Sequence, residues 1–314
     1  MKCHVLYTSD KKYFPHMVTS IYSLLENNND LDLDINIIEQ SFTGRQKEIL
    51  KEIADIYDKC DIRLYNISDL SMGERDVSVL NAKFFAGEII DCSNKVLYLD
   101  SDTIVVNSLK ELFSTKVNHP ISAVKSARVP IYMNGIANSY YNSGVMLFNY
   151  EQLDNEDSLY QMYDALNYYN LPTNNVEQNL MNIALVDNIG TLDLKYNITP
   201  YIYDLSKHHY LLGKFCESNE EFYSKTKIID SVNNACILHN LAYLNTRVWD
   251  KSGMHPFKNS YQQYRKIWDD SFSVDKSEYH FYEKFIPYLN LIAENVLSEK
   301  NYKKVKNKVR DKIS

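Results

Sequence analysis

The sequence predicts an α/β fold in which helices cover a mainly parallel β-sheet on both faces. Short apolar runs typical of buried strands alternate with segments of helical periodicity in the first half of the chain. Polar and acidic residues follow several of these runs at their carboxyl ends, where open parallel sheets bind ligands. The 314 residues, 45% of them hydrophobic, suit one large domain or one domain with an appendage.

The first half of the chain has the clearest elements. Strands are expected over residues 5–7, 34–38, 62–64 and 96–99, and helices over residues 17–25, 81–90 and a segment after Thr43. Thr43 and Gln46 have the spacing of a capping box, and apolar residues follow them at helical intervals. Because Asp10 and Asp100 follow two of the strands, we expect both at the ligand-binding edge of the sheet.

The second half is less regular. Strands are expected over residues 144–148 and 235–238, and helices over residues 157–169 and 177–185. From Asp269 the pattern is wholly helical. We therefore predict two regions, a main α/β domain over residues 1–268 and a small helical appendage with a basic end over residues 269–314.

The net charge and the hydropathy of the chain argue against several classes of protein. The net charge of -7 argues against nucleic acid as the main partner, because such binding relies on a broad basic surface. No apolar run approaches the roughly 18 residues of a membrane-spanning helix, and no secretory leader begins the chain. The five cysteines include no C-x-x-C pair and are interpreted as reduced thiols. We therefore expect a cytoplasmic protein.

The basic C-terminus has more than one interpretation. Lysines and arginines recur from Lys300 to the end of the chain, and such a segment can contact anionic lipid at the inner face of the membrane. A solvated helix end is the alternative. A third interpretation is that the helices from Asp269 onward bind a partner or a protein acceptor.

The most informative local pattern is an apolar strand that ends in Asp100, Ser101 and Asp102. Residues i and i+2 of an extended chain point to the same side, so the two carboxylates can converge on one cation. Mg²⁺ or Mn²⁺ held in this way completes its shell with substrate phosphates and water. A solvated strand end is the alternative, but the chain is apolar on both sides of the pair, as expected for a buried strand.

Several separated segments together resemble one family. In chain order they are residues 5–13, Asn81-Ala82-Lys83 with residues 87–90, residues 95–102, residues 140–149, residues 177–182 and His239. They resemble the motifs of the retaining glycosyltransferases of family 8, which have a nucleotide-sugar-binding, Rossmann-like GT-A fold. The resemblance covers residues 3–250 and implies a UDP-sugar donor and a saccharide acceptor.

The resemblance implies a metal site made of Asp100, Asp102 and His239. The imidazole nitrogen favours Mn²⁺, with Mg²⁺ as the alternative. Such a cation would bridge the donor's two phosphates and neutralise charge on the departing UDP. For His239 taken alone, a structural role in the core is the alternative interpretation.

The resemblance also implies a set of donor contacts. They are Thr8, Ser9, Asp10, Tyr13, Lys83, Ser101, Asn142, Ser143 and Arg247. Asp10 would accept hydrogen bonds from uracil or ribose, and its alternative role is a cap for the following helix. Lys83 stands where the family usually has arginine, and its alternative is a lysine on a helix surface. Arg247 and Trp249 fill the family's Lys and Trp positions only if two residues are inserted after His239.

Glu177 and Gln178 are the expected catalytic residues, because they match the family's acidic-Gln-acidic segment beside the donor sugar. An amide is a poor nucleophile, so Gln178 favours front-face transfer, in which the acceptor attacks from the side that UDP leaves. Asn179 replaces the second acidic residue of the segment, which removes one candidate nucleophile.

These observations predict a metal-dependent retaining hexosyltransferase. Galactose is preferred as the donor sugar and glucose comes next, and the acceptor is a saccharide on a glycan or glycoprotein. The resemblance is closest to bacterial members that extend surface glycans or the glycans of serine-rich adhesins. The alternatives are a catalytically degenerate glycan-binding scaffold and a self-glucosylating primer like glycogenin. A nucleotidyltransferase is disfavoured because no Gly-rich phosphate loop follows the first strand.

Overall fold

The computed structural model of the chain describes residues 2–70, 78–90, 95–127, 139–153, 176–219, 222–244, 246–251 and 254–272. Its strands are β1 (Lys2–Asp10), β2 (Asp32–Gln40), β3 (Cys60–Asn66), β4 (Val96–Leu99), β5 (Thr103–Val105), β6 (Ile121–Lys125), β7 (Tyr141–Phe148), β8 (Ile189–Thr191) and β9 (Ile237–His239). Its α-helices are α1 (Phe14–Glu26), α2 (Gly44–Ile56), α3 (Lys110–Ser114), α4 (Tyr150–Leu153), α6 (Val176–Ala184), α7 (Pro200–Lys207), α8 (His209–Ser218), α9 (Lys225–Asn233) and α10 (Lys258–Trp268).

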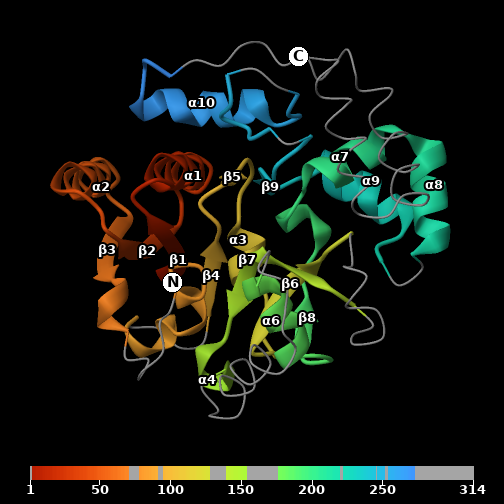
Figure 1. Ribbon diagram of the computed structural model, residues 1–314, viewed down its shortest axis with the longest axis horizontal. Helices are drawn as coiled ribbons and strands as arrows, with labels where there is room; N and C mark the ends of the chain where they lie inside the picture. Colours follow the sequence, from red (N-terminus) through yellow and green to blue (C-terminus); the bar gives the residue numbers. More distant parts are fainter. Residues whose placement is uncertain are drawn as a thin grey trace.

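Seven strands form the central sheet in the order β3-β2-β1-β4-β7-β6-β8, and β5 and β9 form a separate ribbon (Figure 1). β1 is parallel to β2 and β4, β2 to β3, and β6 to β8. β7 is antiparallel to both of its neighbours. The predicted α/β fold with a mainly parallel, mixed sheet is therefore confirmed. Since β1 and β4 are adjacent, Asp10 and Asp100 follow neighbouring strands at one edge of the sheet.

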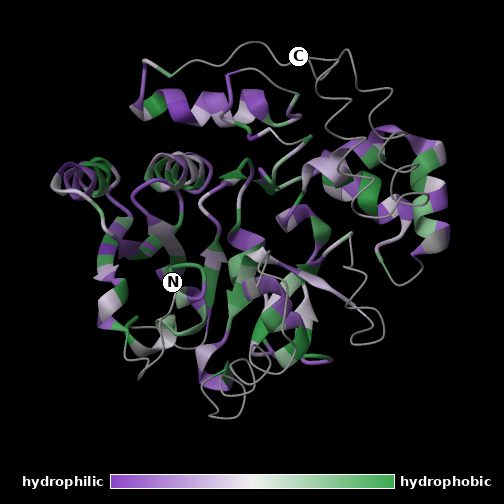
Figure 2. Cartoon of the chain, viewed as in Figure 1, coloured by the Kyte–Doolittle hydropathy of each residue, from purple (hydrophilic) through white to green (hydrophobic). Residues whose placement is uncertain are grey.

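Apolar side chains fill both faces of this sheet. Along β4, Leu97 and Leu99 belong to one core together with residues of α1, whereas Val96 and Tyr98 belong to a second core with residues of α6. Figure 1 shows α1 and α2 on one side of the sheet and α4 and α6 on the other. Figure 2 shows the apolar colour running through β4 and β7. Strands covered on both faces read as continuous apolar runs because neither face meets water.

The predicted capping box is present at the start of α2. The Thr43 hydroxyl accepts a hydrogen bond from the backbone N–H of Gln46 at 3.3 Å, and the Gln46 side chain accepts one from the Thr43 N–H at 2.9 Å. A cap of this kind contributes about 1 kcal/mol to stability. It fixes the turn that returns the chain from β2 into the helix.

One predicted element is wrong. Residues 81–90 form two short 3-10 helices, η2 (Ala82–Phe84) and η3 (Ala86–Glu88), instead of one α-helix. Phe84, Phe85 and Ala86, in the middle of this segment, are all buried. The backbone at Gly87 also lies so close to Tyr150 that an added Cβ would meet its side chain at 2.8 Å.

Several elements were not predicted, namely β5 and its pairing with β9, β6, β8, the short helices α3 and α4, and the helices α7 to α10. The strand predicted over residues 235–238 corresponds to β9. Helix α10 packs on α1, where the Asn27 side chain donates to the Tyr264 hydroxyl at 2.8 Å. The predicted helix over residues 157–169, and the appendage from residue 273 onward with its basic end, lie outside the described residues, so the boundary at 268 stays a prediction. No helix within the described ranges is long and apolar enough to cross a membrane.

Candidate active site

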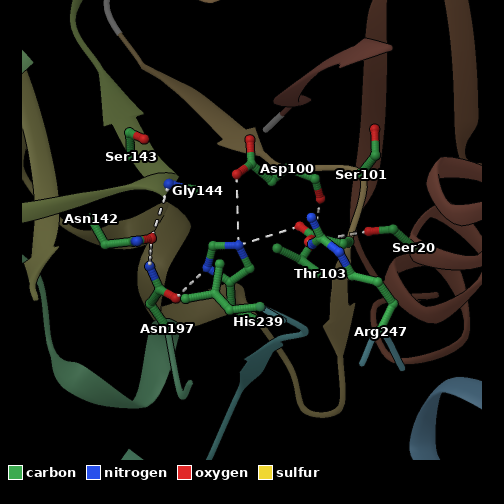
Figure 3. Close-up of polar contacts among 12 residues, drawn as sticks. Ser20, Asp100, Ser101, Thr103, Asn142, Ser143, Gly144, Asn197, His239 and Arg247 are labelled. Carbon is green, nitrogen blue, oxygen red and sulfur yellow. Dashed lines mark hydrogen bonds and ion pairs between the residues drawn. The ribbon is translucent and has the colours of Figure 1, made fainter. Parts of the chain in front are cut away.

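The ribbon of β5 and β9 brings His239 to the acidic pair. β5 begins directly after Asp102, and His239 on β9 pairs with Thr103 on β5. His239 Nε2 then lies 3.3 Å from Asp102 Oδ1 and 3.6 Å from Asp100 Oδ2 (Figure 3). One ligand atom from each of the three residues lies within 4.8 Å of the others. The three predicted ligands therefore share one site at the carboxyl end of β4.

His239 is oriented by a residue that the sequence did not reveal. Its Nδ1 lies 3.0 Å from Asn197 Oδ1, and because an amide oxygen only accepts, Nδ1 carries the hydrogen. The lone pair of the neutral ring is then on Nε2, which faces the carboxylates (Figure 3). His239 is 1% exposed, and its Nε2 has no hydrogen bond of good geometry within the described part of the chain. A buried nitrogen left in this way between two carboxylates fits a divalent cation.

The charges of this cluster depend on one another. Burial disfavours the charged form of Asp102, but the His239 imidazole and the Arg247 guanidinium outweigh it and hold the pKa of Asp102 below its usual range. Burial likewise opposes charge on His239, but Asp102 and Asp100 raise its pKa. The two carboxylates therefore favour positive charge at this position, which a divalent cation would supply.

Asp100 is held through Oδ1, the carboxylate oxygen that Tyr98 and Lys83 approach, whereas His239 faces Oδ2. The Tyr98 hydroxyl donates to Asp100 Oδ1 at 2.6 Å and also lies 3.1 Å from the Thr8 hydroxyl. Burial, followed by the charge of Asp100, raises the pKa of Tyr98 well above its ordinary value, so this hydroxyl remains a donor. Lys83 Nζ lies 3.9 Å from Asp100 Oδ1 and donates to the Ser143 carbonyl at 3.2 Å. Because Lys83 is 1% exposed, the alternative of a helix-surface lysine is wrong.

A chain of amide side chains continues from His239 to the predicted sugar-side residues. Asn197 Nδ2 donates to Asn142 Oδ1 at 2.8 Å, and Asn142 Nδ2 donates to Gln178 Oε1 at 2.9 Å. Gln178 Oε1 also accepts from the Ser143 N–H at 3.2 Å. Three segments that are distant in sequence, β7, α6 and the residue after η5 (Leu194–Tyr196), thus meet beside the cluster. Asn179, in contrast, is fully buried and accepts from the Tyr140 hydroxyl.

The remaining predicted residues surround the same edge. Asp10 Oδ1 accepts from the N–H groups of Lys12 and Tyr13 at 2.9 and 2.8 Å, so it does cap the turn into α1. The Ser9 hydroxyl donates to the Asp10 carbonyl at 3.1 Å, and the Ser101 hydroxyl donates to the Thr8 carbonyl at 3.3 Å. Tyr13 is half-exposed. Glu177 lies at the start of α6, half-buried.

Arg247 reaches the cluster from the loop after β9. Its Nη1 lies 3.4 Å from Asp102 Oδ2, and its backbone N–H donates to Asp250 Oδ2 at 2.6 Å. Tyr243 and Thr246 close a short antiparallel bridge earlier in the loop, with Leu244 at a φ of 49°. The loop therefore brings a basic side chain to the carboxylates. That Arg247 fills the family's lysine position through a two-residue insertion stays a prediction.

A family model described as Glycosyl transferase family 8 matches residues 4–239, which run from β1 to the end of β9. The chain belongs to glycosyltransferase family 8. The family resemblance expected from the motifs is therefore confirmed. The matched segment ends at His239 and contains Asp100 and Asp102, so the whole acidic and imidazole cluster falls within the family's extent.

Curated relatives of this family 8 chain are distant in sequence. A putative glycosyltransferase of Haemophilus influenzae is 22% identical over 71% of this chain and 73% of the relative. Glycosyltransferase GlyF of Streptococcus pneumoniae is 23% identical over 90% of this chain and 66% of GlyF. The lipopolysaccharide 1,2-glucosyltransferase of Escherichia coli is 25% identical over 69% and 66% of the two chains. This chain thus spans about two thirds to three quarters of these relatives.

Solved structures show the same fold. The galactosyltransferase LgtC, in complex with donor and acceptor sugar analogues, aligns with a TM-score of 0.66 and 17% identity over 90% of this chain and 99% of LgtC. GlyE of Streptococcus pneumoniae aligns with a TM-score of 0.62 and 20% identity over 88% of this chain and 66% of GlyE. At these identities the likeness concerns the fold, and it confirms the GT-A architecture of this family 8 chain.

Asn197 offers a test of how the metal ligand is oriented. Asn197→Ala removes both of its contacts, and we expect Mn²⁺ affinity to fall roughly 10- to 100-fold, the usual cost of losing an outer-shell partner. Asn197→Asp keeps an acceptor for His239 but cannot donate to Asn142. We expect this variant to retain Mn²⁺ binding and still to lose transfer activity. Manganese titration followed by electron paramagnetic resonance, with kcat measured beside it, distinguishes the two. Unchanged Mn²⁺ affinity in Asn197→Ala would contradict the orienting role.

Proposed function

We propose that this chain is a metal-dependent retaining hexosyltransferase that moves a hexose from a UDP-sugar to a saccharide acceptor. The observation that carries the proposal is the buried His239 Nε2, which faces Asp100 and Asp102 at the edge of the sheet. Oxygen and imidazole ligands together suit Mn²⁺, with Mg²⁺ as the alternative. Such an ion, when bound, supplies positive charge that stabilises the UDP leaving group.

The chain's own basic residues add to that charge. Lys83 lies on one side of the cluster, 3.9 Å from Asp100, and Arg247 on the other, 3.4 Å from Asp102. We propose that both contact the donor diphosphate, Lys83 as a point charge and Arg247 with its planar guanidinium. Thr8, Ser9, Asp10, Tyr13 and Ser101 would bind the nucleoside, because they line the ends of the adjacent strands β1 and β4.

Gln178 supports retention without a protein nucleophile. Its Oε1 already accepts from the Asn142 side chain and the Ser143 N–H, and an amide is a poor nucleophile. We propose that Gln178, Asn142 and Glu177 hold the hydroxyls of the donor sugar. The acceptor hydroxyl then attacks from the side that UDP leaves, the bond from the anomeric carbon to phosphate oxygen breaks, and a donor phosphate oxygen takes the acceptor's proton.

A pocket beside these amides would take the acceptor. It has a volume of about 120 Å³, and Asn142 and Asn197 are among the residues that line it. The rest of the lining comes mainly from residues 124–127, 199–202 and 241–244, which mix hydroxyl, aromatic and aliphatic groups. Such a mixture suits a sugar, which offers both hydroxyls and an apolar ring face. We propose that this pocket binds a saccharide of a glycan or glycoprotein.

The donor sugar and the location are part of the same proposal. One structural neighbour is named a galactosyltransferase and one relative a glucosyltransferase, so we place galactose first and glucose second. We also propose that the protein acts in the cytoplasm, where the basic C-terminal residues would contact the inner face of the membrane.

A donor screen tests this function. UDP-galactose, UDP-glucose and other UDP-sugars are incubated with the protein, Mn²⁺ and simple saccharides, and UDP release is measured beside the product's anomeric configuration by NMR. We expect UDP release from at least one hexose donor and an α-linked product from the α-linked donor. An inverted anomer would contradict retention. Glycan binding without any UDP release would favour the scaffold alternative.

A further inference from the structure

Arg247 rests on an aromatic stack that lies beyond the metal cluster. Its guanidinium carbon lies 5.6 Å from the centroid of the Trp249 ring, within the range of cation–π attraction. The Trp249 ring in turn stacks on His16 of α1, with centroids 3.5 Å apart and planes 18° apart. Helix α1 therefore supports Arg247 through two flat rings.

The same stack also contacts Tyr13. The Tyr13 ring meets Trp249 edge-on at 6.0 Å and meets His16 edge-on at 5.6 Å. Tyr13 follows β1 and Asp10 on the nucleoside side of the proposed donor site, whereas Arg247 lies beside Asp102 on the diphosphate side. One pair of rings thus contacts a residue at each end of that site.

His16 is fixed in both position and charge. Its Nδ1 lies 2.6 Å from the hydroxyl of Tyr261, a fully buried residue of α10. Burial lowers the pKa of His16 to about 3, so the ring is neutral at physiological pH and does not repel the nearby Arg247. A neutral, hydrogen-bonded ring gives Trp249 a rigid surface.

We propose that His16 and Trp249 are positioning residues, which hold Tyr13 and Arg247 at the spacing that a nucleoside diphosphate requires. The proposal rests on the UDP-sugar donor proposed above. Arg247 needs such support because its side chain is 39% exposed and would lose rotamer freedom on binding. Stacking restricts that freedom before the donor arrives, which strengthens binding of the diphosphate. Arg247 and Trp249 both belong to the loop after β9.

The test compares uridine with UDP, each titrated with Mn²⁺ into the full chain. The readout is the ratio of the two dissociation constants, which measures how much affinity the diphosphate adds. In His16→Leu, which has no flat ring, we expect this ratio to fall roughly three- to tenfold, the range of one cation–π contact. His16→Phe restores a flat ring and should restore the ratio. Tyr264→Phe alters the same α1–α10 interface away from the stack and should leave the ratio unchanged.

The outcomes separate the two proposals. If the unaltered chain binds no UDP, the proposed function fails. If it binds UDP and a folded His16→Leu keeps the normal ratio, the positioning role is wrong. A uniform loss of affinity for uridine and UDP alike would show that the stack does not position Arg247 for the diphosphate, and the proposal would be wrong. Should His16→Leu not fold, Trp249→Leu removes the surface under Arg247 directly, and a normal ratio there would overturn the proposal.

Discussion

Replacing Gly144 with alanine should abolish metal binding and reduce transfer by at least about 100-fold, the cost of misplacing a catalytic group by roughly 1 Å. An alanine Cβ at this position would lie 2.1 Å from His239 Cε1 and 2.8 Å from Asp100 Oδ2. Neither neighbour can move easily, because His239 is buried and hydrogen-bonded to Asn197, and Asp100 is hydrogen-bonded to Tyr98. The ring must leave the cluster or the central strand β7 must shift.

A glycine elsewhere in the chain provides the control. Gly213 lies in α8, and a Cβ there would meet no atom within 4 Å. Gly213→Ala should keep full Mn²⁺ affinity and raise stability slightly, because alanine is favoured over glycine in a helix by up to about 1 kcal/mol. Calorimetric Mn²⁺ titration, kcat/KM and the midpoint of thermal unfolding are measured for both variants. Normal Mn²⁺ binding and transfer by Gly144→Ala would contradict the expected displacement of His239 and Asp100.

The fold could be predicted because its buried strands form apolar runs that can be recognised in the sequence. Residues 96–99 are buried on both faces, so they form an apolar run that stands out in the sequence, and the acidic pair follows at once. The segment 81–90 was predicted wrongly because its apolar residues resemble a helical pattern, while the close approach of Gly87 to Tyr150 constrains the backbone there. The local pattern of apolar residues in a sequence cannot predict such tertiary contacts.

The site could be predicted only where a local motif existed. Asp100 and Asp102 are separated in sequence by one residue, but His239 joins them through the pairing of β5 with β9, and only the family resemblance pointed to it. Asn197 follows a short 3-10 helix and has no pattern of its own. Its role depends on its hydrogen bonds to His239 and Asn142, which are distant from it in sequence, and no sequence pattern predicts those two contacts.

Asp102→Asn should lower both Mn²⁺ affinity and transfer activity by more than about 100-fold. Losing an outer-shell partner of a metal ligand costs up to about 100-fold, and this substitution removes a ligand itself. The substitution keeps the shape of the side chain, so no cavity forms. The backbone should also stay in place, because the Asp102 carbonyl accepts from the Asn240 N–H at 2.9 Å. Electron paramagnetic resonance of Mn²⁺ and UDP release from the preferred donor measure the two losses.

Asp34 is the matched control for this variant. It is a buried carboxylate with the same kinds of partner as Asp102, because its Oδ2 lies 2.9 Å from His4 Nδ1 and 3.2 Å from Arg63 Nη1. It pairs with His4 near the start of β1, about 20 Å along the strand from Asp10. Asp34→Asn should therefore lower the midpoint of thermal unfolding while Mn²⁺ affinity stays unchanged. If both variants lost Mn²⁺ binding equally, the loss would reflect disruption of a buried charge rather than coordination, and the metal site proposed at Asp100, Asp102 and His239 would be wrong.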